Sequence, residues 1–97
     1  DKNTGYIANL TDGFVIGFKY FSCKGIKKIS VTTRGYFDGQ LEVRTKWDGP
    51  VIGAIKIVYS NFWEQNSAEI QLPDGDNALF FTVKGNGNFQ FKDFTLE

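Results

Sequence analysis

The 97-residue sequence contains no histidine, no methionine and a single cysteine, Cys23. Without histidine the chain lacks the commonest general base and metal ligand, and one cysteine forms neither an internal disulfide nor a cysteine-rich zinc site. Its 11 Lys and Arg residues balance 11 Asp and Glu residues, so no basic excess is present to bind phosphates. No apolar run approaches the roughly 20 residues of a membrane-spanning helix. We therefore expect neither a nucleic acid nor a membrane as partner.

What the sequence has in excess is aromatic residues, with ten Phe, four Tyr and two Trp. Its apolar residues alternate with polar ones in short runs bounded by Gly, Asp, Asn or Pro, a pattern typical of strands joined by tight turns. Roughly seven or eight such runs follow one another, as in a sandwich or jelly roll. We predict one all-β domain over residues 1–97, excised from a larger enzyme. Its fold is a β-sandwich jelly roll of roughly seven to nine short antiparallel strands.

The alternation places one set of side chains on the inner face of each predicted strand. These inward residues are Phe14, Ile16, Phe18 and Tyr20; Ile29, Val31 and Thr33; Leu41, Val43 and Thr45; Val51, Ile55 and Ile57; Ala68, Ile70 and Leu72; and Leu79, Phe81 and Val83. Turns are predicted at residues 12–13, 38–39, 48–50 and 73–75, and a short edge strand at residues 5–9. Near the C-terminus the phase changes, because Phe89 and Phe91 are odd-numbered whereas Phe94 and Leu96 are even. This change predicts a β-bulge near residues 92–93.

Catalysis needs a set of cooperating groups, and the sequence does not provide one. The common hydrolytic triads pair a nucleophile with histidine, and a glycosidase needs two carboxylates. Five acidic residues lie in or beside the predicted turns, where they satisfy backbone donors: Asp12, Asp38, Asp48, Asp74 and Asp76. Glu42, Glu64 and Glu69 lie on polar strand faces. We predict a protein that is not an enzyme and uses no cofactor.

Three stretches taken together resemble one known family. The first is GFVIGFKYF at residues 13–21. The second, between residues 33 and 53, contains TRG, GQLEVR and DGPVIG. The third contains DG, ALFF and KGNG between residues 74 and 87, and then the run from Phe91 to Leu96. In this order they are similar to the family 6-like carbohydrate-binding modules of the small type found C-terminal to family 43 glycoside hydrolases. The resemblance covers residues 5–97. It implies a sandwich that binds plant cell-wall polysaccharide of the xylan or β-glucan class and tethers an attached hydrolase catalytic domain to it, outside a bacterial cell.

The resemblance also implies a sugar-binding tryptophan. Trp63, which follows Asn61 and Phe62, takes the place of the family's stacking ring. Its odd number places it on the face opposite Ala68, which favours exposure. The alternative is a ring that plugs the end of the sandwich. We predict Trp63 and the neighbouring Asn61 as binding residues.

A second aromatic and an amide complete the site that the resemblance implies. The family's loop aromatic falls near Phe14 or Val15, and the alternation instead assigns Phe14 to the core. Tyr36 and Phe37 lie in a predicted turn where only one ring points inward, and Tyr36 is the better sugar ligand because it adds a hydroxyl to an apolar face. Tyr36 has an alternative role as a hairpin-tip ring that covers the sandwich edge.

The family's C-terminal Asn falls at Gln90, whose amide keeps a donor and an acceptor. Asn88 or Asn86 could instead supply the amide of the family's Asn. The alternative is that both form turns and have no binding role. Lys92 takes the place of an Asp that helps to bind a structural calcium in larger modules. Because calcium needs about 6–8 oxygen ligands, we predict no metal site.

Two other functions remain open at the level of sequence. One is a structural module that packs against its hydrolase domain and binds little or no glycan, with the same aromatic residues as an interface. The other is a generic adhesion or receptor-like sandwich that binds protein. In each case we expect a monomer.

Overall fold

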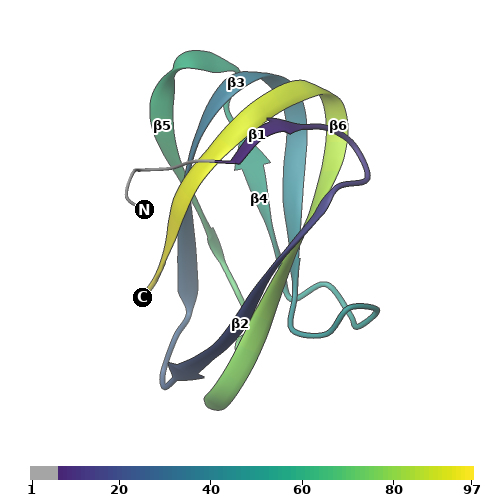
Figure 1. The fold of residues 1–97 in the computed structure, drawn as a ribbon. Coiled ribbons are helices and arrows are strands. Elements are labelled where there is room, and N and C mark those ends of the chain that lie inside the picture. Colours follow the sequence, from purple (N-terminus) through teal and green to yellow (C-terminus); the bar gives the residue numbers. More distant parts are fainter. Residues whose placement is uncertain (1–6) are drawn as a thin grey trace.

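The computed structural model describes residues 7–97, apart from the side chain of Lys19. Within this range the chain forms six strands and no helix (Figure 1), so no described segment forms a helix able to cross a membrane. The strands are β1 (Ile7–Leu10), β2 (Val15–Cys23), β3 (Lys28–Arg44), β4 (Gly53–Ile57), β5 (Ser60–Glu69) and β6 (Gly75–Leu96). All their pairings are antiparallel. The predicted all-β class is confirmed. The predicted edge strand at residues 5–9 lies partly outside the described residues.

Two long strands, β3 and β6, form both halves of the sandwich. They pair with each other from Ile29 opposite Leu96 to Arg44 opposite Phe80, and they curve over together at the top of Figure 1. On one side of this bend β2 and β4 extend the sheet. On the other side β1 and β5 extend it. The inner faces of the two halves enclose the core between them.

The bend corrects the predicted turn at residues 38–39, because β3 runs through this point without a break. Gly39 lies directly opposite Gly85 of β6. A Cβ atom on Gly39 would lie 2.1 Å from the carbonyl oxygen of Lys84, and one on Gly85 would lie 2.3 Å from that of Asp38. Only glycine permits so close a backbone approach. These glycines therefore bend two paired strands instead of reversing one.

Tyr36 and Phe37 are consequently residues of a continuous strand and not of a hairpin tip. Phe37 points into the core and is fully buried, whereas 57% of Tyr36 is exposed. The prediction that only one of these two rings points inward is confirmed, and the exposed ring is that of Tyr36.

Register shifts interrupt four of the five pairings between the described strands, and two of them bear on the predicted strand faces. In β6, Asp93 pairs with Thr32 and Phe91 with Thr33, which leaves Lys92 as the extra residue. The predicted bulge at residues 92–93 is confirmed. The register of β2 also shifts, between Phe18 and Phe21.

The β2 register shift corrects part of the predicted inner face. Phe21 packs against the core, and Tyr20 is 74% exposed. Phe14, at 51% exposure, and Val51 also lie outside the predicted core, because each precedes the strand that was expected to bury it.

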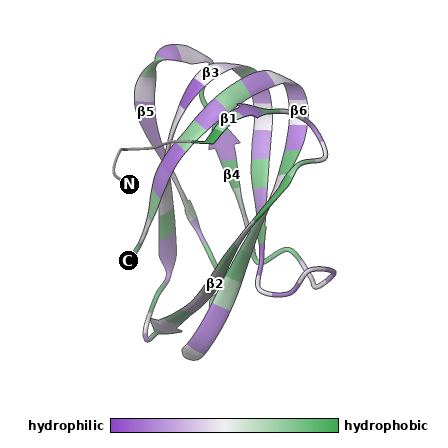
Figure 2. Cartoon of the chain, viewed as in Figure 1, coloured by the Kyte–Doolittle hydropathy of each residue, from purple (hydrophilic) through white to green (hydrophobic). Residues whose placement is uncertain are grey.

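The core is a cluster of phenylalanine rings surrounded by aliphatic side chains. Phe37, Phe81, Phe89 and Phe91 are almost completely buried, and Phe18 and Phe94 pack against this cluster. Burial of one such side chain stabilises a fold by about 1.5–3 kcal/mol. Figure 2 shows the matching alternation of hydrophobic and hydrophilic bands along the strands. Most phenylalanines are therefore explained by packing.

We predict that Gly39→Ala lowers the free energy of unfolding far more than Gly25→Ala. The new methyl group would contact the backbone of Lys84, which has no room to move within the β3–β6 pair. Gly25 has a positive φ of 66° but open space around it, so alanine there costs about 1–2 kcal/mol. Urea unfolding of the two variants gives the comparison, and equal losses would contradict the role assigned to the bend.

Candidate functional site

The bend has a pocket of about 340 Å³ on its outer side. Its lining residues come from three strands: Arg34, Gly35 and Tyr36 of β3, Asn61 of β5, and Asn88, Phe89 and Gln90 of β6. The register explains why they meet, because Arg34 lies opposite Gln90 and Tyr36 opposite Asn88. On the other side of β3, Gly35 lies opposite Ser60 at the start of β5. We call this the amide pocket.

Four of the predicted site residues come together in the amide pocket. Asn61 and Asn88 are exposed, Gln90 is half-buried, and the ring of Tyr36 stands beside them. Each amide side chain offers a carbonyl acceptor and two N–H donors. The tyrosine adds an apolar face and a hydroxyl. This combination suits a ligand with both hydroxyl groups and apolar C–H faces.

Trp63 lies beside the amide pocket and is not among its lining residues. The ring is half-buried, and the guanidinium carbon of Arg34 stands 4.4 Å from its centroid. Arg34 Nε donates a hydrogen bond of 2.7 Å to Gln90 Oε1. Trp63 therefore holds Arg34 by a cation–π contact, and Arg34 in turn fixes the amide of Gln90. The two N–H groups of Gln90 take no part in that bond.

Phe14 lies away from the other predicted site residues. It is in the loop between β1 and β2, and its carbonyl oxygen accepts a hydrogen bond from the N–H of Val83. Val83 pairs with Leu41, on the other side of the bend from Gln90. The structure therefore does not bring Phe14 into the amide pocket.

Sequence reasoning missed two residues, Arg34 and Tyr59. The ring of Tyr59 contacts that of Tyr36, with 5.1 Å between the centroids and 39° between the planes. Tyr59 lies between β4 and β5, and it is 66% exposed. The TRG motif drew attention to Arg34 but gave it no role. No signal in the sequence pairs Tyr59 with Tyr36, because that contact depends on the fold.

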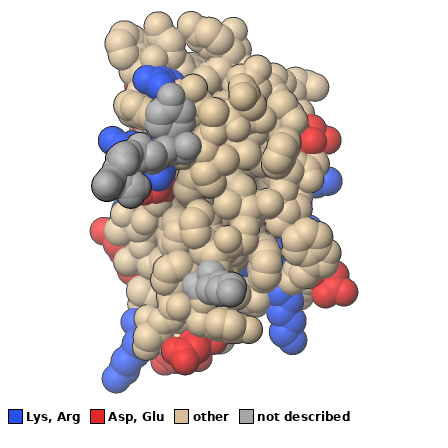
Figure 3. Space-filling model, viewed as in Figure 1, with Lys and Arg blue, Asp and Glu red and all other residues tan. Residues whose placement is uncertain are grey.

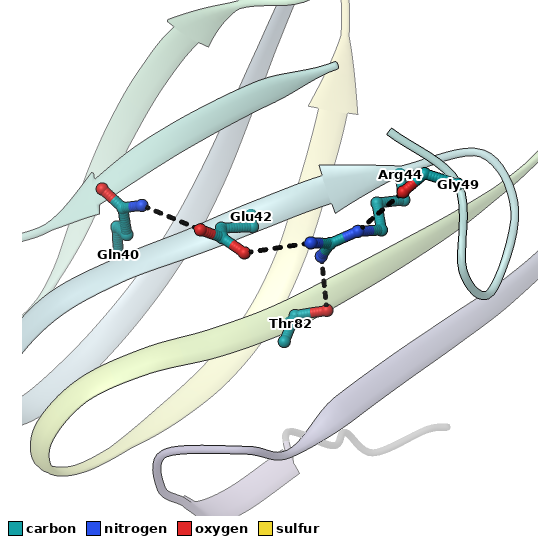
Figure 4. A network of polar contacts seen from close by, with 5 residues as sticks. All are labelled: Gln40, Glu42, Arg44, Gly49 and Thr82. Carbon is teal, nitrogen blue, oxygen red and sulfur yellow. Dashed lines mark hydrogen bonds and ion pairs between the residues drawn. The ribbon is translucent and has the colours of Figure 1, made fainter. Parts of the chain in front are cut away.

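A second polar cluster lies on the outer face of the opposite half (Figure 4). Arg44 binds Glu42 across 3.3 Å, the hydroxyl of Thr82 at 3.0 Å and the carbonyl oxygen of Gly49 at 3.0 Å. The bond to Gly49 anchors the loop after β3. This loop carries Trp47, which is 70% exposed and meets Phe80 edge-on. Arg44 thus holds an exposed tryptophan in place.

Charged side chains do not gather into one patch on the face drawn in Figure 3. Figure 3 shows Lys, Arg, Asp and Glu side chains scattered over the visible face among uncharged residues. Among residues 7–97, no group of three or more His, Cys, Asp or Glu side chains gathers where it could hold a metal ion. The side chains that line the amide pocket offer hydrogen bonding and aromatic contact, together with the guanidinium of Arg34.

Comparison with known proteins gives one curated relative. No protein-family model matches the chain. A xylosidase/arabinosidase from Thermoclostridium stercorarium is 50% identical over 96 residues, which make up 99% of this chain and 20% of that protein. The chain thus spans one fifth of the length of this relative.

Solved structures match the fold. A β-1,3-glucan-binding family 6 module from Bacillus halodurans superposes with a TM-score of 0.86 and 18% identity, covering 100% of this chain and 80% of that one. The chain has the fold of a family 6 carbohydrate-binding module. A family 6 module from Clostridium cellulolyticum, solved with xylose, also gives 0.86, with 14% identity and coverage of 95% and 78%.

The fold of this chain also superposes on part of a hydrolase. A family 43 arabinoxylan arabinofuranohydrolase from Bacillus subtilis, solved with cellotetraose, gives a TM-score of 0.80 and 20% identity, over 94% of this chain and 20% of that one. The resemblance of the sequence to family 6 modules is confirmed at the level of the fold.

We predict that Arg34→Ala exposes the ring of Trp63 in this family 6 fold. The substitution removes the guanidinium from the ring and deletes the bond to Gln90, with a loss of about 1–2 kcal/mol of stability. Acrylamide quenching in a Trp47→Phe background, where Trp63 is the remaining tryptophan, measures the exposure. Unchanged quenching would contradict the contact, and Arg44→Ala provides the matched arginine control.

Proposed function

We propose that this domain is a non-catalytic carbohydrate-binding module of a secreted bacterial glycoside hydrolase, which it directs to plant cell-wall polysaccharide. The observation that carries the proposal is the amide pocket, whose lining includes three amide side chains and the exposed Tyr36. The fold and the curated relative support the same reading. Xylan and β-glucan are the substrate classes proposed, because both present uncharged pyranose rings.

Binding would combine two weak interactions. The apolar face of a sugar ring would pack on Tyr36, and its hydroxyl groups would bond to Asn61, Asn88 and Gln90. A hydrogen bond of this kind contributes about 0.5–1.5 kcal/mol net, and aromatic contacts contribute a similar amount. A few such contacts give a weak site. A weak site is sufficient for a module on a polymer, because neighbouring sugars keep the local ligand concentration high.

Trp63 would support this site through Arg34. A sugar stacked directly on the ring would have to share it with the guanidinium, which stands 4.4 Å from the ring centroid. We therefore infer that Tyr36 makes the stacking contact. Trp63 would position Arg34, and Arg34 would orient Gln90.

A second candidate function is a structural module that packs against the hydrolase catalytic domain. The observation that favours it is Trp47, an exposed ring on a loop that Arg44 anchors. An aromatic residue presented in this way is typical of the centre of a protein interface. The curated relative is five times as long as the matched region, which leaves room for such a partner domain.

We predict that Tyr36→Ala and Gln90→Ala each weaken retention in affinity gels that contain soluble xylan or β-glucan. Loss of one stacking or hydrogen-bonding group corresponds to about a five- to tenfold weaker affinity. Tyr20→Ala is the matched control, because Tyr20 is an exposed tyrosine of β2 outside the pocket. Trp63→Ala should also weaken retention, through Arg34. If the wild-type domain shows no retention on any polysaccharide, the proposed function is wrong.

The structural alternative predicts a different result. In the intact hydrolase, Trp47→Ser should lower the melting temperature of the catalytic domain and leave polysaccharide retention unchanged. Calorimetry of the whole enzyme and of the isolated domain measures the difference. A melting temperature that does not change in the whole enzyme would argue against this packing.

A further inference from the structure

The amide pocket has the dimensions of a small binding site and continues on one side into an aromatic surface. Its volume of about 340 Å³ is at the lower end of the roughly 300–1,000 Å³ of ligand pockets, which suits one or two sugar rings. Tyr36 belongs to the pocket and also contacts Tyr59, which is not among the pocket's lining residues. The aromatic surface therefore extends beyond the site that the amides define.

Tyr59 lies at this boundary, directly before β5. Ser60, the next residue, begins β5 and lies opposite Gly35 on the floor of the pocket. The hydroxyl of Ser60 accepts a hydrogen bond of 3.0 Å from the N–H of Phe62, which orders the backbone between Tyr59 and Asn61. Both tyrosine rings stay largely exposed despite their mutual contact. An exposed aromatic pair of this kind has an apolar surface available to a ligand.

We propose that Tyr36 and Tyr59 form a continuous platform, and that the site binds an internal segment of a glycan chain along its length. One sugar occupies the amide pocket, and the next sugar along the chain packs on Tyr59. The distance of 5.1 Å between the ring centroids is comparable to the length of one pyranose residue in a β-linked chain. The two rings are tilted by 39° relative to each other. This tilt favours a chain whose successive sugar rings are rotated relative to each other, and disfavours a chain that forms a flat ribbon. This inference rests on the proposed function.

The experiment is a titration with a length series, from the monosaccharide xylose to xylohexaose, by isothermal calorimetry. The wild-type affinity should rise with each added sugar until the platform is filled. Tyr59→Ala should lower the affinity for xylobiose and the longer oligosaccharides about three- to tenfold and leave that for the monosaccharide xylose nearly unchanged. Tyr59 is exposed, so its removal should preserve the thermal unfolding midpoint, and Tyr20→Ala serves as the control for loss of an exposed tyrosine.

Borohydride-reduced oligosaccharides test whether the site binds along the chain. Because an internal segment is bound, converting the reducing end to an alditol should leave the affinity for xylohexaose unchanged. Loss of binding on reduction would overturn the inference and indicate recognition of the chain end. An affinity independent of length would also overturn it, while leaving the proposed function intact. If neither the oligosaccharides nor any polysaccharide bind, the proposed function itself fails.

Discussion

The passage of β3 and β6 through one shared bend depends on a backbone contact that only glycine allows. Gly39 and Gly85 face each other so closely that a Cβ atom on either would overlap the opposing chain. Because both strands pass through this point unbroken, the same two strands contribute to both halves of the sandwich. The core then fills the space between the halves. The outer side of the bend gathers the side chains of the amide pocket.

The sequence predicted the parts of the fold that depend on local pattern. The inward sets from Ile29 to Thr33 and from Leu79 to Val83 are buried as expected, because alternation reports directly which side of a strand faces the core. The bulge at Lys92 was also predictable, because the apolar residues before it, Phe89 and Phe91, are odd-numbered, whereas those after it, Phe94 and Leu96, are even-numbered. The register shift in β2 was not, because Tyr20 and Phe21 are adjacent aromatic residues and the alternation continues as well through Tyr20 as through Phe21.

The bend was mistaken for a turn for a physical reason. Asp-Gly is a strong turn signal, but glycine is equally necessary where two backbones approach closely. The two cases differ only in what lies across from the glycine, and a single sequence does not contain that information. The site shows the same limit. The resemblance located Asn61, Asn88 and Gln90, and the pairing of one inward with one outward ring located Tyr36. The contacts of Arg34 and Tyr59 arise from cross-strand neighbours.

The length of the β3–β6 pairing also has a consequence for how the chain folds. Arg44 pairs with Phe80 at one end of the ribbon and Ile29 with Leu96 at the other, so the loop that must close is shorter at the Arg44 end. Loop-closure entropy grows with loop length, and the bond from Arg44 to Thr82 lies at this same end. Pairing is therefore expected to start there and to propagate through the glycine bend toward the C-terminus. A topology built on such distant contacts folds slowly, and because neither half exists without the shared ribbon, the halves fold as one cooperative unit.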